Sequence, residues 1–372
     1  ARGWDSYSWH TDLPPGHPMV TGSQTNDFDL FSTEHAKLII PWGMNWITTK
    51  MPDSHWMTEA RLKGAKIATV TVEYSATASK CDEVVVIRPG SDPAFALGLA
   101  QVIISKNQYD ADWVAKNTDL PFLIRMDTLE PLRPKDFIKG FVEPDLKSIQ
   151  FVKEGDKSKD KLKQFASESM KEDFQSYVVI DERGHTKVVT RDDFGKNFEK
   201  LGIFPKLNVE TTVKLLDGKS VKVRSGFHLI REYLNKNFTP AKTSAITGAP
   251  VEGVLKFAKL ISENKEKTLF ATGMGPNQFF NADLKDRAIF LVAALTRNVG
   301  FPGGNVGSYA GNYRSSIIGG EPVYASEDPF NLNLNKGGKS KIKKYSHYES
   351  IHYFNYGQRP LKIGKKMFTG EG

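Results

Sequence analysis

Two glycine-containing turns, each following a short apolar run, are the parts of this sequence best suited to holding a phosphate group. Residues 38–45 and 269–277 both read as a buried strand, a turn with Gly43 or Gly273, and then an Asn. Glycine lets backbone N–H groups approach phosphate oxygens, and the start of a following helix favours an anion. The two stretches therefore predict a pair of related nucleotide pockets or, as the alternative, ordinary turns of an α/β core.

Two acidic residues lie where their carboxylates could hydrogen-bond a nucleotide. Glu73 ends the strand after the first turn, where dinucleotide folds place a ribose-binding carboxylate. It lies about 30 residues after Gly43, whereas the simple fingerprint has about 20 and a Gly-x-Gly-x-x-Gly turn that this chain lacks. Asp92 stands at the start of a helix, so we expect an N-cap, with recognition of a purine edge as its second role.

The stretch 10–17 carries a carboxylate between two histidines. Asp12 lies between His10 and His17, and Pro14-Pro15 restricts the backbone on its C-terminal side. A carboxylate is a hard oxygen ligand, suited to a high-valent oxo metal or a hard divalent cation. Because the three residues lack a defined metal-ligand spacing, the pattern alone favours a surface turn.

Several other kinds of chemistry are excluded. The sequence has no His-Glu-x-x-His, Gly-x-Ser-x-Gly or P-loop motif. Cys81 is the only cysteine, so this segment alone makes no disulfide framework, iron–sulfur cluster or Cys-rich zinc site. No apolar run approaches the ~18–20 residues needed to cross a bilayer.

Size and charge describe an ordinary globular polypeptide with a basic excess. The 372 residues are 39% hydrophobic and 25% charged, which excludes wholesale disorder and allows two or three domains. The formal net charge is +8. The sequence begins at Ala1 without a signal-peptide pattern and stops at Gly372 without a clear element end, so we expect a piece of a larger polypeptide.

The elements that must position these residues alternate between strand and helix. Strands are expected at 37–42, 67–72, 83–87 and 268–272. Helices are expected at 53–64, 93–104, 250–261 and 283–299. Strands and helices alternating at this spacing predict an α/β fold with a parallel sheet covered on both faces.

The middle and the end of the chain differ from this pattern. Residues 145–175 are highly charged and predict a solvated helix or a surface insertion. Hairpins are expected at 177–190 and at 212–223, the latter turning at Asp217-Gly218. Residues 336–366 interleave lysines with aromatics, which favours solvated lysines beside buried rings over nucleic-acid binding.

Taken together, the motifs resemble the molybdenum bis(molybdopterin guanine dinucleotide) oxidoreductases of the dimethyl-sulfoxide-reductase family. They occur in the family's order and cover about residues 1–130 and 240–315. The matching segments are Asp12-Leu13-Pro14-Pro15, Trp42-Gly43-Met44-Asn45, Pro52-Asp53, Lys63-Gly64, Arg88-Pro89-Gly90-Ser91-Asp92, Gly273-Met274-Gly275-Pro276-Asn277-Gln278 and 295–304. The Asp-Leu-Pro-Pro segment resembles the branch whose metal is held by an Asp, which includes membrane-bound nitrate reductases.

The resemblance implies a role for each matching residue. Asp12 would be the protein ligand to molybdenum. Our hypothesis for that site is that His10, His17 or Asn277 hydrogen-bonds the substrate or the metal-bound oxygen. The first turn and the two acidic residues would contact one dinucleotide: Trp42, Gly43, Asn45, Glu73, Gly90 and Asp92. The second turn would line the second pterin: Gly273, Met274, Gly275, Asn277 and Gln278.

The resemblance also implies an architecture and partners. Two Rossmann-like lobes would bind the cofactor: residues 1–235, with a charged and hairpin-containing insertion at about 145–235, and an incomplete second lobe at 236–330, before a basic segment at 331–372. A [4Fe-4S] cluster would lie N-terminal to this segment. The partners would be an iron–sulfur beta subunit and a haem-bearing, membrane-linked gamma subunit, in a membrane-associated complex on the periplasmic side, without nucleic acid.

The residues around Asp12 bear on the substrate. Nitrate reductases have a different pattern where this chain has Trp9-His10-Thr11 and Gly16-His17-Pro18. This difference favours the nitrite-oxidising members, with a small anion as substrate. Reduction of nitrate, chlorate or selenate is the nearest alternative. A nicotinamide dehydrogenase is disfavoured by the missing Gly-x-Gly-x-x-Gly, and a basic nucleic-acid-binding protein is the alternative from another class.

Overall fold

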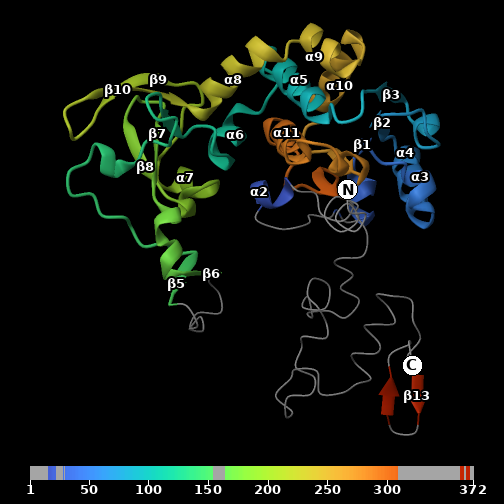
Figure 1. Cartoon of the computed structure of the whole chain (residues 1–372), viewed down its shortest axis with the longest axis horizontal. Coiled ribbons are helices and arrows are strands. Elements are labelled where there is room, and N and C mark those ends of the chain that lie inside the picture. The colour runs from blue at the N-terminus through green and yellow to red at the C-terminus, as the bar shows by residue number, and fades with distance from the viewer. Residues whose placement is uncertain are drawn as a thin grey trace. The chain divides into compact units, whose positions relative to one another are not determined.

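A five-stranded parallel sheet forms the centre of the fold. The computed structural model describes residues 16–21, 28, 30–153, 164–308, 361–363 and 366–368. The strands of the sheet are β1 (Leu38–Trp42), β2 (Lys66–Thr71), β3 (Glu83–Val86), β11 (Thr268–Thr272) and β12 (Asn305–Ser308). They lie in the order β12-β11-β1-β2-β3, and every neighbouring pair is parallel. Figure 1 labels β1, β2 and β3 of this sheet.

The two apolar runs that sequence analysis assigned to separate lobes are neighbours in this sheet. β1 and β11 are buried along their whole length and pair in register from Leu38 with Thr268 to Trp42 with Thr272. The α/β class and the parallel sheet are therefore confirmed, and in the described residues the strands expected in two lobes lie in one sheet. A fully buried central strand needs a partner on each edge, and β11 supplies the second one for β1. The expected boundary between 235 and 236 does not separate two sheets.

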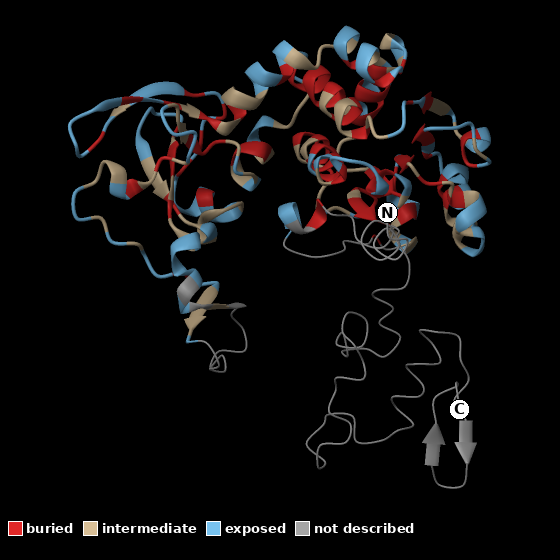
Figure 2. Ribbon diagram, in the orientation of Figure 1, coloured by how far each residue is buried: buried red, intermediate tan, exposed pale blue. Residues whose placement is uncertain are grey.

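Helices cover the sheet and complete its core. Those beside it are α2 (His17–Thr21), α3 (Trp46–Thr49), α4 (Ser54–Leu62), α5 (Asp92–Ser105), α9 (Pro240–Thr247), α10 (Val251–Glu263) and α11 (Ala282–Leu295). α5 packs against both α10 and α11, and α4 packs against β2. Buried residues of α5 and α11 join those of the strands in one apolar core (Figure 2).

A β-rich insertion separates α6 (Ala111–Asn117) from α8 (Gly226–Asn237). Its strands are β4 (Leu123–Arg125), β5 (Ile149–Val152), β6 (Gln164–Ser167), β7 (Tyr177–Ile180), β8 (Thr186–Val189), β9 (Glu210–Lys214) and β10 (Ser220–Ser225), with a short α7 (Lys196–Lys200). Both expected hairpins are confirmed, β7 with β8 and β9 with β10. The insertion has small apolar clusters of its own, one around Val223 and one around Phe198. It begins before residue 145, because β4 pairs with β10.

The charged stretch 145–175 also differs from the expected solvated helix. Its described residues form the parallel pair β5 and β6 and a 3-10 segment, Glu168–Phe174. Near the other end of the chain, Leu361–Ile363 and Lys366–Phe368 form an antiparallel pair, and the rest of the basic segment lies outside the described residues. In the described part of the chain, no helix combines the length and apolar character that crossing a membrane requires.

Candidate functional site

The carboxyl ends of the parallel strands define one edge of the sheet. From β1 the chain proceeds outward to β2 and β3, and it then returns to place β11 on the opposite side of β1, followed by β12. The direction of winding therefore reverses between β1 and β11. In open α/β sheets, ligands bind beyond the carboxyl ends of the strands at such a reversal. The candidate site lies where these two strands end.

The two predicted glycine turns meet at this point. The backbone N–H of Gly273 donates to the carbonyl of Trp42 (2.8 Å). A Cβ on Gly273 would overlap the carbonyl oxygen of Gly43, and a Cβ on Gly43, which has φ +61°, would overlap the ring of Pro276. Both residues must therefore be glycine because the turns are in contact. Instead of two separate pockets, the structure has two turns sharing one edge.

Asp92 faces the same edge from the start of α5. Ser91 occupies the N-cap position, so the expectation that Asp92 caps the helix is wrong by one residue. The fully buried indole of Trp42 donates from Nε1 to Asp92 Oδ1 (2.8 Å). Burial raises the pKa of Asp92, while the hydrogen bond from Trp42 and the charge of Lys285 oppose that rise. Trp42 thus holds Asp92, and its own side chain belongs to the core.

Asn45 and Glu73 lie beyond the ends of β1 and β2. Asn45 Oδ1 accepts hydrogen bonds from the backbone N–H (3.2 Å) and hydroxyl (3.0 Å) of Thr77, so this side chain fixes the connection after β2. Glu73 is exposed two residues after the end of β2. Its position at the sheet edge, with the carboxylate accessible, is suited to hydrogen bonding with ligand hydroxyl groups.

The loop after β3 reaches across to the second turn. Gly90 has φ +77°, and a Cβ there would lie 3.2 Å from the ring of Phe279. Phe279 directly follows the 3-10 turn η7 (Gly275–Gln278). Within that turn region Met274 is half-buried, whereas Gly275 and Gln278 are exposed. The predicted contacts from β1, β3 and β11 are therefore neighbours along one edge.

Asn277 is the predicted residue with the most distinctive surroundings. It is fully buried, and its Oδ1 accepts a hydrogen bond from Lys285 Nζ (2.6 Å). Its Nδ2 is buried with no hydrogen-bond partner among the described residues. An unpaired buried N–H donor is costly and calls for an acceptor. Asn277 therefore offers a donor to a group that the described residues do not supply.

Lys285 and Asp286 join Asn277 to the start of α2. The two side chains are 1% and 0% exposed, and Lys285 Nζ lies 2.5 Å from Asp286 Oδ1. The other Asp286 oxygen accepts a hydrogen bond from the backbone N–H of Gly16 (3.0 Å). We call Gly16, Asn277, Lys285 and Asp286 the Asp286 cluster. It links the residues after the Asp-Leu-Pro-Pro segment to the second glycine turn.

His17 lies beside this cluster. Its ring packs edge-on against Phe290 (centroids 5.1 Å apart), and Nε2 lies 3.7 Å from Asp286 Oδ1. Burial lowers the pKa of His17 to about 4, and the attraction of Asp286 offsets only part of that effect. At neutral pH the imidazole is uncharged. His17 thus serves the packing of α2 on α11, whereas His10 and Asp12 lie outside the described residues.

The sequence did contain a signal for Lys285 and Asp286, which sequence analysis missed. Positions 282, 285, 286, 289 and 293 lie on one face of a helix, and Ala282, Ile289 and Ala293 on that face are buried. Two adjacent charges on such a face predict a buried ion pair. Their partners, Gly16 and Asn277, could not be read from the helix.

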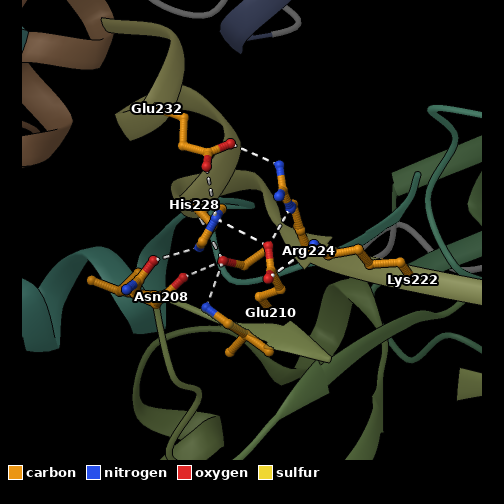
Figure 3. A network of polar contacts seen from close by, with 9 residues as sticks. Asn208, Glu210, Lys222, Arg224, His228 and Glu232 are labelled. Carbon is orange, nitrogen blue, oxygen red and sulfur yellow. Dashed lines mark hydrogen bonds and ion pairs between the residues drawn. The ribbon is translucent and has the colours of Figure 1, made fainter. Parts of the chain in front are cut away.

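A second cluster of charged side chains lies in the insertion and α8. Arg224 Nε lies 2.5 Å from Glu210 Oε2, and Arg224 NH1 lies 2.7 Å from Glu232 Oε2. His228 Nδ1 contacts Asn208 Oδ1 at 2.9 Å (Figure 3). Together with Lys222 these residues form what we call the Glu210 cluster; Glu210 and Glu232 are 39% and 55% exposed. No group of three metal-ligating side chains occurs in the described ranges, here or at the sheet edge.

Comparison with known proteins identifies relatives for this arrangement. The sequence profile of the family described as molybdopterin oxidoreductase matches residues 4–363. The perchlorate reductase alpha subunit of Dechloromonas aromatica is 30% identical over 315 residues, covering 84% of this chain and 33% of that protein. The respiratory nitrate reductase alpha subunit of Haloferax mediterranei is 31% identical over 305 residues, with 82% and 29% covered.

A relative with lower sequence identity is covered to a similar extent. The respiratory nitrate reductase 1 alpha chain of Escherichia coli is 26% identical over 363 residues, covering 82% of this chain and 29% of that protein. The chain therefore spans no more than a third of the length of the curated relatives it matches here.

Proposed function

This chain belongs to the molybdopterin oxidoreductase family, and we propose that it forms the part of a catalytic subunit that holds a molybdenum–pterin cofactor at the β1–β11 edge and oxidises nitrite to nitrate. The observation that carries the proposal is the meeting of the two glycine turns where the winding of the sheet reverses. Sequence matching gives the family, and the contact between the two turns supports the proposal that the cofactor binds at this edge.

The residues at this edge are chemically suited to such a cofactor. Asp92 is a buried carboxylate able to accept hydrogen bonds from a guanine edge, and Glu73 is an exposed one able to accept them from a ribose. Asn277 presents a buried donor without a partner among the described residues, which a pterin or a substrate oxygen would satisfy. We propose the bis(molybdopterin guanine dinucleotide) form, with Asp12 as the ligand to molybdenum and a [4Fe-4S] cluster outside this segment.

In the proposed reaction, nitrite and water yield nitrate, two protons and two electrons. The bound molybdenum centre supplies two-electron oxygen-atom exchange. The protein orients the anion, and we assign Asn277 Nδ2 to the hydrogen bond with substrate. Lys285 is already neutralised by Asp286, so it does not trap the anionic product by charge. Burial lowers the pKa of His17 to about 4 and its ring packs against Phe290, so we assign His17 to the packing of α2 on α11.

The names of the relatives favour one second candidate function, reduction of nitrate or of a chlorine oxyanion. The three relatives are described as perchlorate or nitrate reductases. We retain nitrite oxidation as the first proposal because the residues flanking Asp12 differ from the nitrate-reductase pattern. Partners would be an iron–sulfur beta subunit and a haem-bearing gamma subunit, in a membrane-associated complex on the periplasmic side.

Assays in both directions, together with cofactor analysis, test the proposal. The full-length subunit in its complex is expected to contain molybdenum and two pterins, and to oxidise nitrite faster than it reduces nitrate with the same electron carrier. Asp12→Ala is expected to remove molybdenum or turnover, while Glu130→Gln, an exposed position in the insertion, leaves both unchanged. Full activity of Asp12→Ala, or a protein without pterin, contradicts the proposal; faster nitrate reduction selects the second candidate.

A further inference from the structure

Lys285 determines which end of the Asn277 amide faces away from it. Its ammonium donates to Asn277 Oδ1 (2.6 Å), and both side chains are buried. An ammonium carries three donors and no acceptor. Turning the amide over would place its NH2 group against the donors of Lys285, so the attraction would become a repulsion. The carbonyl oxygen of Asn277 is therefore held toward Lys285, and Nδ2 is directed away from it.

The backbone of Asn277 is fixed as well. Its N–H donates to the carbonyl of Met274 (3.0 Å) within the turn that contains η7. The preceding residue, Pro276, is buried, and its ring lies so close to Gly43 that a Cβ there would be 2.2 Å from it. With the backbone held in this way, rotation of the side chain is the freedom that remains to Asn277, and the hydrogen bond from Lys285 restricts it.

A lysine gives this contact a property that an uncharged partner would lack. A hydroxyl or a second amide can both donate and accept, so it would permit either orientation of the Asn277 amide. Lys285 permits one. Because a lysine is rarely fully buried without a counter-charge, it needs Asp286, whose Oδ1 lies 2.5 Å from its Nζ. The ion pair therefore supplies a fixed direction for the amide rather than a free positive charge.

The direction that results is toward a position where an acceptor is missing. Asn277 Nδ2 is buried and has no hydrogen-bond partner among the described residues. Buried donors without an acceptor are rare and costly. Since Lys285 prevents the amide from presenting its oxygen there, only a group that accepts a hydrogen bond can satisfy this position.

We propose that Lys285 is a positioning residue that holds Asn277 with its N–H donors toward the ligand of the β1–β11 edge, so that this position selects a hydrogen-bond acceptor. This inference rests on the proposed function, because a ligand at that edge is part of it. Lys285 acts through Asn277, and Asp286 acts by neutralising Lys285. An oxygen of a small oxyanion and a carbonyl oxygen of a pterin offer the same acceptor chemistry, and the experiment separates them.

The test compares three variants of the full-length subunit in its complex. Asn277→Asp keeps the size of the side chain and replaces its donors with an acceptor. Lys285→Met/Asp286→Asn frees the amide to turn, leaves no unpaired charge and keeps an acceptor for the N–H of Gly16. Arg287→Gln, at an exposed position on the same helix, is the matched control.

Five readouts are taken from each protein. Titration calorimetry gives the affinity for nitrate and, separately, for chlorate. Steady-state kinetics give KM and kcat for nitrite. Pterin per protein and the thermal midpoint show whether the cofactor and the fold are retained.

Asn277→Asp is expected to weaken nitrate binding about 10- to 100-fold, the size of a hydrogen bond to a charged group. The KM for nitrite should rise with it while kcat changes less, as for an interaction made before the transition state. The double variant is expected to weaken binding about 2- to 10-fold, because its amide presents the donor for only part of the time. Arg287→Gln should match the wild type.

Loss of pterin in both Asn277→Asp and the double variant, with unchanged nitrate affinity in the loaded protein, would assign the acceptor to the cofactor and support the same role for Lys285. Wild-type affinity, KM and pterin content in either variant would overturn the inference. Losses that only follow the fraction of unfolded protein would overturn it too.

Failure of the proposed function gives a different result. A wild-type complex that binds chlorate but does not oxidise nitrite contradicts nitrite oxidation, and the chlorate affinities of the same variants then decide the role of Lys285. A wild-type complex that binds neither anion and holds no pterin would overturn both.

Discussion

The Asp286 cluster and the Glu210 cluster use the same kinds of side chain in opposite surroundings. In the first, Lys285 and Asp286 are almost completely buried; Lys285 donates to Asn277, eight residues away, and Asp286 accepts from Gly16, 270 residues away in the sequence. In the second, Glu210 and Glu232 are 39% and 55% exposed, and the partners come from β9, β10 and α8, which are close in sequence (Figure 3). Water screens the second cluster, whereas the charged side chains of the first are buried.

This difference predicts which cluster is more sensitive to mutation. Exposed ion pairs contribute little, since solvated side chains lose little when they separate. A buried pair is sensitive to the loss of either partner, because the remaining charge has no water to solvate it. Four mutational experiments follow in the order of the size of the expected effect, and the first and the last compare the two clusters directly.

The largest effect is expected from Asp286→Ala. The change leaves the Lys285 charge buried without its carboxylate, and removing one partner of a buried pair typically costs about 3–5 kcal/mol. Denaturant unfolding followed by tryptophan fluorescence would measure it. A loss as small as that of the exposed variants would show that water reaches this site.

His17→Gln is expected to change the pH dependence of stability. The folded protein keeps His17 neutral to a pKa of about 4, whereas the unfolded chain binds the proton near pH 6.5. Stability linked to the neutral ring is therefore present above pH 6.5 and is lost as the pH falls toward 4, by about 3 kcal/mol in total. Unfolding measured at pH 7, 5.5 and 4.5 should show a flatter profile for the variant. The exposed His35→Gln is the control, and equal profiles for wild type and His17→Gln would contradict the assignment.

Gly273→Ala tests the contact between the two turns. The new Cβ would overlap the carbonyl oxygen of Gly43, and overpacking of this kind costs about 1–3 kcal/mol. For Gly275→Ala the Cβ would lie 3.3 Å from the same oxygen, so a smaller loss is expected. Thermal unfolding of the two variants side by side would measure the difference, and equal losses would show that the turns are not packed as described.

The smallest effect is expected from Glu232→Gln in the Glu210 cluster. Arg224 retains Glu210 as a partner, and an exposed pair contributes about 0–1 kcal/mol. The change in unfolding free energy should shrink further at 1 M salt, where the screening length is about 3 Å. A loss of unfolding free energy comparable to that of Asp286→Ala would contradict the proposed difference between the two clusters.

The local elements could be predicted because their causes are local. A few neighbouring residues suffice to predict the continuous apolar run of β1, the β-branched run of β2 and the Asp217-Gly218 turn. The start of α5 was misplaced by one residue, because Ser91 and Asp92 are both acceptable caps. The side chain of Asp92 instead accepts a hydrogen bond from the indole of Trp42, which is 50 residues away in the sequence.

By itself, the sequence determined the α/β class, the family and the two glycine turns. Only the tertiary structure decided that β11 pairs with β1 in one sheet, and that Lys285 and Asp286 connect Asn277 with Gly16. The reason is physical. Apolar periodicity records whether a residue is buried, which depends on its immediate neighbours. Which distant segment covers it depends on how the whole chain packs, and no local pattern records that.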